Sequence, residues 1–159
     1  MATVDIAIEA FDDAFYEVSF VGTTREYGQQ YAAPNGIEVV VDGVRFASEY
    51  EWGTGNVERP TTGTKWAFLS VSVTNASGEA ARLPAPSTFG IVTKDDEEHG
   101  VESFFKDDKY AGGEVADGET RSGEILFEVP LGTTAENARA TWSREFLEGP
   151  VRAFWTAPE

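Results

Sequence analysis

The sequence predicts a single all-β domain, an antiparallel β-sandwich or a barrel, on three observations. Turn-forming residues recur about every eight to twelve positions, and the apolar residues between them mostly alternate, as strands with one buried face require. No long segment repeats its apolar residues with the 3.6-residue period of a helix. The chain has 159 residues, of which 41% are hydrophobic and 13% aromatic, so it is long and apolar enough for one packed core.

The N-terminal part of the chain leaves two structures open. Residues 15–21 alternate as a strand does, whereas residues 9–16 also fit a short helix, because two phenylalanines lie four positions apart. We assign residues 1–26 to an N-terminal extension or an extra strand that packs on the sandwich. Residues 27–159 form the sandwich domain, and no linker divides them.

The middle of the chain contains the clearest strand. Before it, residues 37–46 alternate around Asp42-Gly43, where glycine supplies the positive φ of a hairpin or a bulge. The strand itself spans residues 65–74, and its odd positions from 67 to 73 are uniformly apolar, so we expect that face to point into the core. A turn at residues 75–78 ends it.

The second half of the sequence continues the pattern of short strands and turns. An exposed acidic loop is expected at residues 95–100 and a turn at residues 117–119. Pro130 stops the strand before it, because proline cannot donate to a ladder. Gly123 is expected to allow a β-bulge. The strands predicted in this half are 88–93, 101–105, 121–129, 138–142 and 151–155.

The charge of the chain bears on its environment. It holds 28 Asp and Glu against 12 Lys and Arg, a net charge of −16. Such like charges repel, and salt relieves the repulsion by shortening the Debye length from about 8 Å at physiological strength to about 3 Å at 1 M. We therefore expect a protein of a salt-adapted (halophilic) microbe, with an ordinary acidic protein as the alternative. Nucleic acid is excluded as a partner, because no basic patch is present.

The absence of cysteine removes disulfides, thiolate metal sites and cysteine nucleophiles. No apolar run approaches the roughly 20 residues that span a bilayer, so no membrane span is expected. No signal peptide is visible at the start of the sequence. The location expected is extracellular or at the cell surface if a leader was removed, and cytoplasmic otherwise.

A family resemblance covers about four-fifths of the chain. It rests on a Tyr-Gly pair before a β-run, a Gly-Thr-Lys sequence that leads into an alternating strand, and a turn followed by a final strand. The matching residues are 27–28, 63–65, Asn75, 117–120, Gly123 and 125–130. The chain resembles the immunoglobulin-like domains of bacterial and archaeal surface lipoproteins, a family of unknown function related in fold to the mycobacterial immunoprotective extracellular antigen. The resemblance implies an immunoglobulin-like sandwich of seven to nine strands in an extracellular, membrane-tethered context. It supplies no catalytic residues, and the lipidated cysteine with which members usually begin is absent here.

Acidic residues in two stretches are the candidates for a metal site. Hard cations such as calcium take six to eight oxygen ligands, which two neighbouring loops of a sandwich can supply. The spacing is not that of an EF-hand, and in so acidic a chain the alternative is a solvated face. The candidate calcium ligands are Asp95, Asp96, Glu97, Glu98, Asp107 and Asp108. No cofactor is expected, with calcium as the one alternative that the sequence leaves open.

Other candidate sites each have a structural alternative. Asn75-Ala76-Ser77 fits the N-glycosylation pattern, or is a strand-ending turn. The single histidine, His99, is expected in an exposed loop, where it lacks the burial of a catalytic triad. The four tryptophans, at positions 52, 66, 142 and 155, could form a sugar-stacking platform or pack in the core and at its rim. Paired carboxylates for glycoside hydrolysis are not excluded by counting, but no pair stands out as buried.

These observations favour a non-catalytic interaction module with immunoglobulin-like fold at or outside the cell surface of a halophilic microbe. Its expected partner is a protein or a component of the cell envelope. The alternative function is a calcium- or glycan-binding sandwich that uses the acidic loops.

Overall fold

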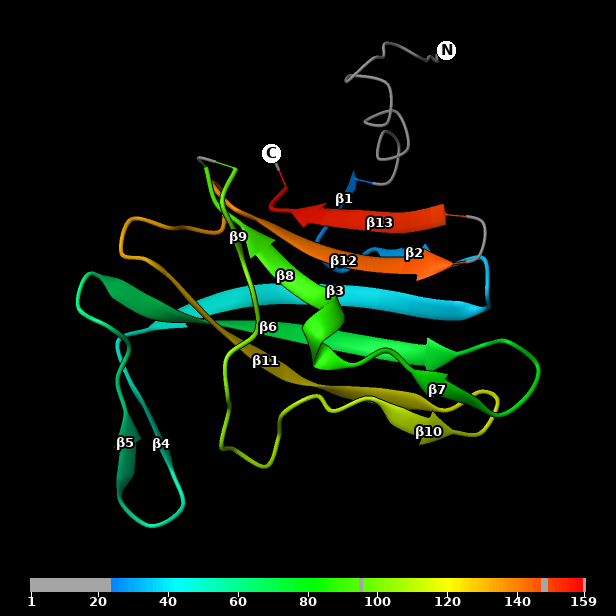
Figure 1. The fold of residues 1–159 in the computed structure, drawn as a ribbon, viewed down its shortest axis with the longest axis horizontal. Helices are drawn as coiled ribbons and strands as arrows, with labels where there is room; N and C mark the ends of the chain where they lie inside the picture. The colour runs from blue at the N-terminus through cyan, green and yellow to red at the C-terminus, as the bar shows by residue number, and fades with distance from the viewer. Residues whose placement is uncertain (1–23, 95, 147–148, 159) are drawn as a thin grey trace, which may run out of the picture.

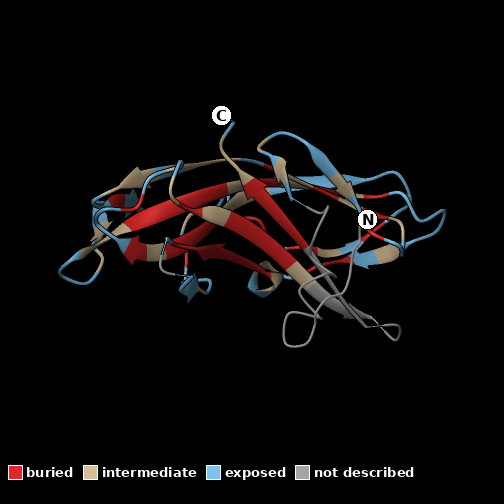
Figure 2. Cartoon of the chain, turned by 90° about the horizontal axis from the view of Figure 1, so that it is seen from above, coloured by how far each residue is buried: buried red, intermediate tan, exposed pale blue. Residues whose placement is uncertain are grey.

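Two β-sheets packed face to face form the protein, as a computed structural model shows for residues 24–94, 96–146 and 149–158 (Figure 1). The strand predicted at 15–21 and the alternative helix at 9–16 lie outside these residues. Buried residues concentrate on the facing strands of the two layers, and exposed residues lie mostly in the loops around them (Figure 2). The predicted all-β sandwich is therefore confirmed.

One sheet has four strands, all paired antiparallel, in the order β11-β6-β3-β2. The other has five, in the order β1-β13-β12-β8-β9, of which only β1 runs parallel to its neighbour. The bounds of the first sheet are β11 Thr120–Pro130, β6 Thr64–Asn75, β3 Ile37–Ala47 and β2 Gln30–Ala32. Those of the second are β1 Thr24–Glu26, β13 Gly149–Thr156, β12 Arg139–Phe146, β8 Phe89–Val92 and β9 Glu98–His99.

Two small antiparallel strand pairs and one turn of 3-10 helix complete the fold. They are β4 Tyr50–Trp52 with β5 Asn56–Glu58, β7 Ala81–Leu83 with β10 Gly113–Val115, and η2 Pro86–Thr88. The described residues thus contain thirteen strands instead of seven to nine, because the chain adds short strands of two to four residues around the long ones.

The main core lies between the two sheets. The odd positions of β6 face it with at most 1% of their surface exposed, as predicted: Ala67, Leu69, Val71 and Val73. From the other sheet, Trp142 and Trp155 are fully buried in the same cluster. The Trp155 indole N–H donates to the backbone oxygen of Gln29 at 2.8 Å, which satisfies its polar atom in an apolar setting.

The Asp42-Gly43 pair makes a bulge within a single strand. β3 runs through it from Ile37 to Ala47, and its pairing with β6 shifts register between Val41 and Gly43. The hairpin alternative was wrong, and so was its reason, because Gly43 does not have a positive φ. One extra residue absorbed in the ladder is enough to make a bulge.

The other face of β6 is also buried at its beginning. Trp66 and Phe68 form an outer cluster with Tyr50, Phe104 and Leu126, on the side of the four-stranded sheet opposite the main core. The cluster draws these residues from the region of β4, from the chain after β9 and from β11. The sheet is therefore covered on both faces over part of its length.

Two of the predicted elements after β8 were wrong. Residues 101–105 do not form a strand: Val101 makes a single bridge to Phe127, and the chain then leaves the sheet. Conversely, Glu98 and His99, expected in an exposed loop, form β9 against β8. A two-residue strand buries too little apolar surface to leave an alternating pattern in the sequence.

Candidate functional site

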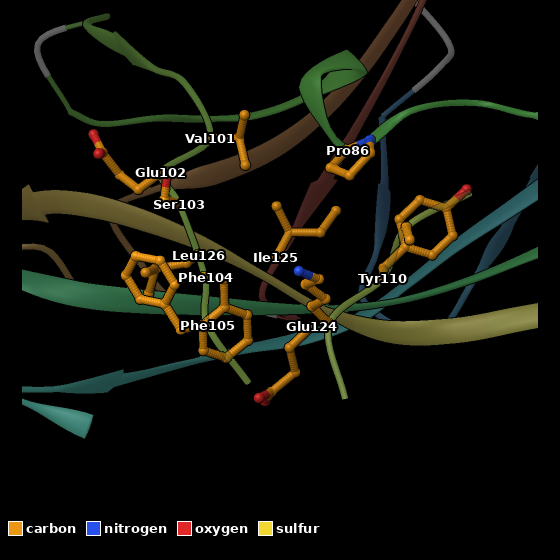
Figure 3. A pocket seen from close by; sticks show the side chains of 12 residues that line it. Pro86, Val101, Glu102, Ser103, Phe104, Phe105, Tyr110, Glu124, Ile125 and Leu126 are labelled. Carbon is orange, nitrogen blue, oxygen red and sulfur yellow. The ribbon is translucent and has the colours of Figure 1, made fainter. Parts of the chain in front are cut away.

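A hollow between β11 and the segment 101–111 is the candidate site. We call it the edge pocket; its volume is about 370 Å³. Figure 3 shows the Phe105 and Tyr110 rings toward opposite sides of it. Most of its lining is apolar or aromatic: Pro86, Val101, Phe104, Phe105, Tyr110, Ala111, Ile125 and Leu126, with Glu102, Ser103, Lys109 and Glu124 as the polar members.

The segment is hydrogen-bonded to the outer edge of β11 at both ends. The backbone N–H of Glu102 donates to the oxygen of Leu126 at 2.8 Å. Further on, the N–H of Tyr110 donates to the oxygen of Glu124 at 2.9 Å, and the N–H of Glu124 donates to the oxygen of Asp108 at 3.1 Å. The residues between these contacts leave the strand edge, and the pocket lies in that gap.

Gly123 allows the segment to approach β11 this closely. A Cβ atom at this position would lie 2.5 Å from the nitrogen of Tyr110, 2.7 Å from the carbonyl carbon of Lys109 and 2.8 Å from the oxygen of Asp108. The predicted bulge was wrong, because the pairing of β11 with β6 runs through Gly123 without a register shift. The glycine is required by a close crossing of two backbones.

Tyr110 anchors the far end of the segment. Its side chain is 2% exposed and packs edge-on against Phe89, with ring centroids 5.9 Å apart. Its hydroxyl donates to the backbone oxygen of Pro84 at 2.7 Å. Burial raises the pKa of the phenol above its usual value, against a smaller opposite effect of Arg121. The tyrosine therefore remains a neutral hydrogen-bond donor at physiological pH.

Phe104 anchors the middle of the segment, and its neighbour Phe105 points the other way. The Phe104 ring lies 5.1 Å from that of Tyr50 and 5.6 Å from that of Phe68, inside the outer cluster. Phe105 is 47% exposed and packs against Trp52, with ring centroids 4.9 Å apart. Adjacent side chains of an extended chain point to opposite sides, so one phenylalanine holds the segment and the next is presented to solvent.

An ion pair closes the outer cluster beside the pocket. The Arg45 guanidinium donates to both carboxylate oxygens of Glu124, at 2.9 Å each, and lies 4.0 Å from the centroid of the Phe68 ring. The hydrogen bond to Glu124 raises the pKa of Arg45 above its usual value, although partial burial opposes the shift. The carboxylate of Glu124 is thus already engaged by an arginine.

A second hollow adjoins the first on the other side of Phe105. We call it the acidic hollow; its volume is about 680 Å³, and it lies between the turn after β4 and the segment 105–108. It is lined by Glu51, Trp52, Gly53, Phe105, Lys106, Asp107 and Asp108. Two of the predicted calcium ligands, Asp107 and Asp108, therefore belong to this surface.

The remaining predicted ligands lie elsewhere. Asp96 and Glu97 belong to the turn between β8 and β9, and Glu98 begins β9, whereas Asp95 lies outside the described residues. The Asp96 side chain is 89% exposed, with a carboxylate oxygen 3.7 Å from an Arg139 nitrogen. Within the part of the chain that the structure describes, no three His, Cys, Asp or Glu residues are grouped as a metal requires. Calcium binding stays a prediction.

His99 and Asn75 both occupy structured positions. The His99 side chain is only 20% exposed, and its Nε2 lies 3.3 Å from the Thr93 hydroxyl, so the expected exposed loop was wrong. Asn75 is fully buried: its Nδ2 donates to the oxygen of Glu79 at 2.8 Å, and its Oδ1 accepts from the N–H of Ser77 at 3.0 Å. Glycosylation stays a prediction, and a glycan on this nitrogen would require the Asn75 turn to open.

The four tryptophans are not on one surface. Trp142 and Trp155 lie in the main core and Trp66 in the outer cluster. Trp52 alone among them is partly exposed, beside Phe105. The sequence did not identify the edge pocket; the available signal was the adjacent pair of phenylalanines in a run that does not alternate.

The packed sheets and the edge pocket define an immunoglobulin-like β-sandwich protein with an apolar site on the edge of one sheet. Residues 28–142 match the family described as Domain of unknown function (DUF4352), and the chain belongs to that family. The resemblance inferred from the sequence is confirmed. No curated protein matches the chain.

Solved structures share the fold at low sequence identity. The chain is similar to the yjhA protein from Bacillus subtilis, with 12% identity over 84% of this chain and 99% of that one and a TM-score of 0.64. A putative lipoprotein (ycdA) from the same species has 11% identity over 84% of this chain and 40% of that one, with a TM-score of 0.60. MPT63, a secreted protein from Mycobacterium tuberculosis, has 17% identity over 84% of this chain and 95% of that one, with a TM-score of 0.56. At these identities the likeness concerns the fold alone.

Across the described ranges, no helix has the length and apolar character needed to cross a bilayer.

Proposed function

We propose that this domain is a non-catalytic interaction module at or outside the cell surface of a salt-adapted microbe, and that it binds a protein or envelope component through the edge pocket. The observation that carries the proposal is an apolar hollow with solvent-exposed side chains at its opening. Val101 is 37% and Phe105 47% exposed, and both line the pocket. Leaving such apolar surface in water is unfavourable, and a partner that covers it gains about 25 cal/mol per Å².

The dimensions of the pocket agree with binding. Ligand sites are concave and mostly apolar, with a few polar groups and a volume of roughly 300–1,000 Å³. The edge pocket, at about 370 Å³, lies at the lower end of that range. Its size suits one inserted side chain or a small ring better than a large ligand.

The polar groups at the pocket support a non-catalytic role. A hydrolytic site needs a carboxylate or imidazole free to exchange a proton with the substrate. Glu124 is held by Arg45 through two hydrogen bonds, and Glu102 and Ser103 are exposed at the rim. His99, the single histidine of the chain, bonds Thr93 and is not part of the lining.

The net charge and the structural neighbours support the proposed location. A charge of −16 is tolerated best where salt screens it. The similar structures include a putative lipoprotein and a secreted protein, which agrees with a location at or outside the cell surface.

The test titrates the domain with indole, an apolar probe of the pocket, and detects binding by amide NMR shifts in concentrated KCl. Saturable shifts are expected for residues 101–111 and 124–126. They should be lost in Ser103→Trp, whose side chain fills the pocket from an exposed position, and kept in the matched control Ala80→Trp, at an exposed site away from it. Shifts that do not saturate, or that are equal in the two variants, would reject the pocket as a binding site.

A further inference from the structure

We propose that the partner is an extended peptide segment that carries an apolar residue and a lysine or arginine two positions apart. The apolar side chain enters the edge pocket, and the basic side chain crosses the Phe105 ring into the acidic hollow. This inference rests on the proposed function and adds the chemical class of the partner.

The two hollows are close enough for one short segment to occupy both. Phe105 lines both of them, so the apolar space and the acidic one meet at this side chain. Alternate side chains of an extended chain point to the same side and lie about 7 Å apart. Two residues with a single residue between them can therefore place one side chain on each side of Phe105.

The aromatic pair between the hollows suits a cation. Trp52 and Phe105 lie with ring centroids 4.9 Å apart and an interplanar angle of 32°. The Trp52 indole N–H donates to a carboxylate oxygen of Glu58 at 3.0 Å, which holds the ring in its orientation. A lysine or arginine head placed over such rings is attracted by their π-electrons.

The charges around the aromatic pair select the sign of the partner. Glu51, Asp107 and Asp108 line the acidic hollow with one cation, Lys106, and Arg45 interacts electrostatically with Asp108 from outside the lining. The whole chain carries −16, so at low salt, where screening is weak, its field also attracts basic segments and repels acidic ones. Lys109 at the edge pocket is a single opposing charge and is exposed.

A joined apolar and basic segment uses both surfaces, and simpler ligands use only one. A free metal ion or a small cation leaves the edge pocket empty and Phe105 exposed. A purely apolar ligand leaves the carboxylates of the acidic hollow without a counter-charge. The adjacency of the two hollows thus favours a ligand in which the two chemistries are covalently linked.

The experiment uses three capped synthetic heptapeptides, titrated by amide NMR at the lowest KCl concentration at which the domain is folded. They contain Phe-Ser-Lys, Phe-Ser-Glu or Ala-Ser-Lys at the centre of a Gly/Ser sequence. The Phe-Ser-Lys peptide should bind about tenfold more tightly than either of the others, because each loses one of the two contacts. Shifts should include residues 51–53 and 105–108 as well as the edge pocket.

Two double variants with the same net charge test the acidic hollow. Asp107→Asn with Asp108→Asn should weaken binding of the Phe-Ser-Lys peptide about fivefold, and should not weaken binding of the Phe-Ser-Glu peptide. Glu26→Gln with Glu136→Gln removes the same charge from exposed positions outside the two hollows, and should change the affinity for neither peptide.

The outcomes separate the two proposals. If indole binds the edge pocket but Phe-Ser-Lys and Phe-Ser-Glu peptides bind equally, the basic partner is refuted and the proposed function stands. Equal weakening by the two double variants also refutes it, because only net charge then matters. If neither indole nor any peptide binds, both proposals fail.

Discussion

Replacing Gly123 with alanine tests the packing that creates the edge pocket. The new Cβ would lie 2.5 Å from the backbone nitrogen of Tyr110, whereas ordinary contact begins at 3.4 Å. Either the segment or β11 must therefore move by about 0.9 Å. β11 is held along its whole length by β6, so we expect the segment to be displaced.

The cost follows from the contacts that the displacement breaks. A shift of this size lengthens the bonds from Tyr110 N–H to Glu124 and from Glu124 N–H to Asp108 beyond hydrogen-bonding range. Overpacking of this kind costs typically 1–3 kcal/mol, and we expect about 2 kcal/mol of unfolding free energy to be lost. For a chain of this length that corresponds to a melting temperature lower by about 4–8 °C.

Urea unfolding at fixed KCl measures the free energy, and amide hydrogen exchange locates the change. The amides of Tyr110 and Glu124 should exchange faster in Gly123→Ala, while that of Val71 in the centre of β6 should not. Gly132→Ala is the matched control, because a Cβ there meets nothing within 4 Å and the residue does not have a positive φ. Equal stability of the two variants, or unchanged exchange at Tyr110, would refute the close crossing.

Four further predictions concern charge and ionisation. Burial raises the pKa of Tyr27 to about 12, above the unfolded value near 10, so stability should fall as pH rises from about 10 to 12. In pH-dependent urea unfolding, Tyr27→Phe should make that decline less steep, and an unchanged slope would contradict the burial. The melting temperature should rise by several degrees between 0.1 and 1 M KCl, as the Debye length falls from about 10 to about 3 Å, and a salt-independent value would argue against salt adaptation. A double-mutant cycle of Arg45→Met and Glu124→Gln should give a coupling of about 0.5–1 kcal/mol, since the arginine is half exposed, and no coupling would show that the pair does not stabilise the outer cluster. If the acids at 95–98 and 107–108 bind calcium, the midpoint of thermal unfolding should be higher in calcium than in chelator at one fixed ionic strength, and the rise should saturate. The stabilisation is about 2.7 kcal/mol at a hundredfold excess over Kd, and an unchanged midpoint refutes calcium binding.

The long strands could be predicted from the sequence because their pattern is local. In β6, alternation identifies the element, and the apolar odd positions from 67 to 73 identify the face that meets the main core. In β11 the predicted range 121–129 lies within the observed Thr120–Pro130. These strands are long enough for the period of two to stand out from chance.

The candidate site was not predictable in the same way, because its parts are far apart in the chain. The outer cluster joins Tyr50, Phe68 and Phe104, which no sequence period relates. A strand was predicted at 101–105, but the apolar side chains of that segment serve the outer cluster and the pocket instead of a ladder. Propensity was overridden there by tertiary packing.

The sequence by itself determined the all-β class, the core face of the central strand, the acidic surface and the absence of cysteine chemistry, since each follows from composition or from a short-range period. Tertiary structure alone decided that Gly123 faces a crossing backbone, that Phe104 is buried while Phe105 is exposed, and that Asp107 and Asp108 border an aromatic pair. The physical reason is that burial and close approach depend on which distant segments meet, and a one-dimensional pattern does not contain those contacts.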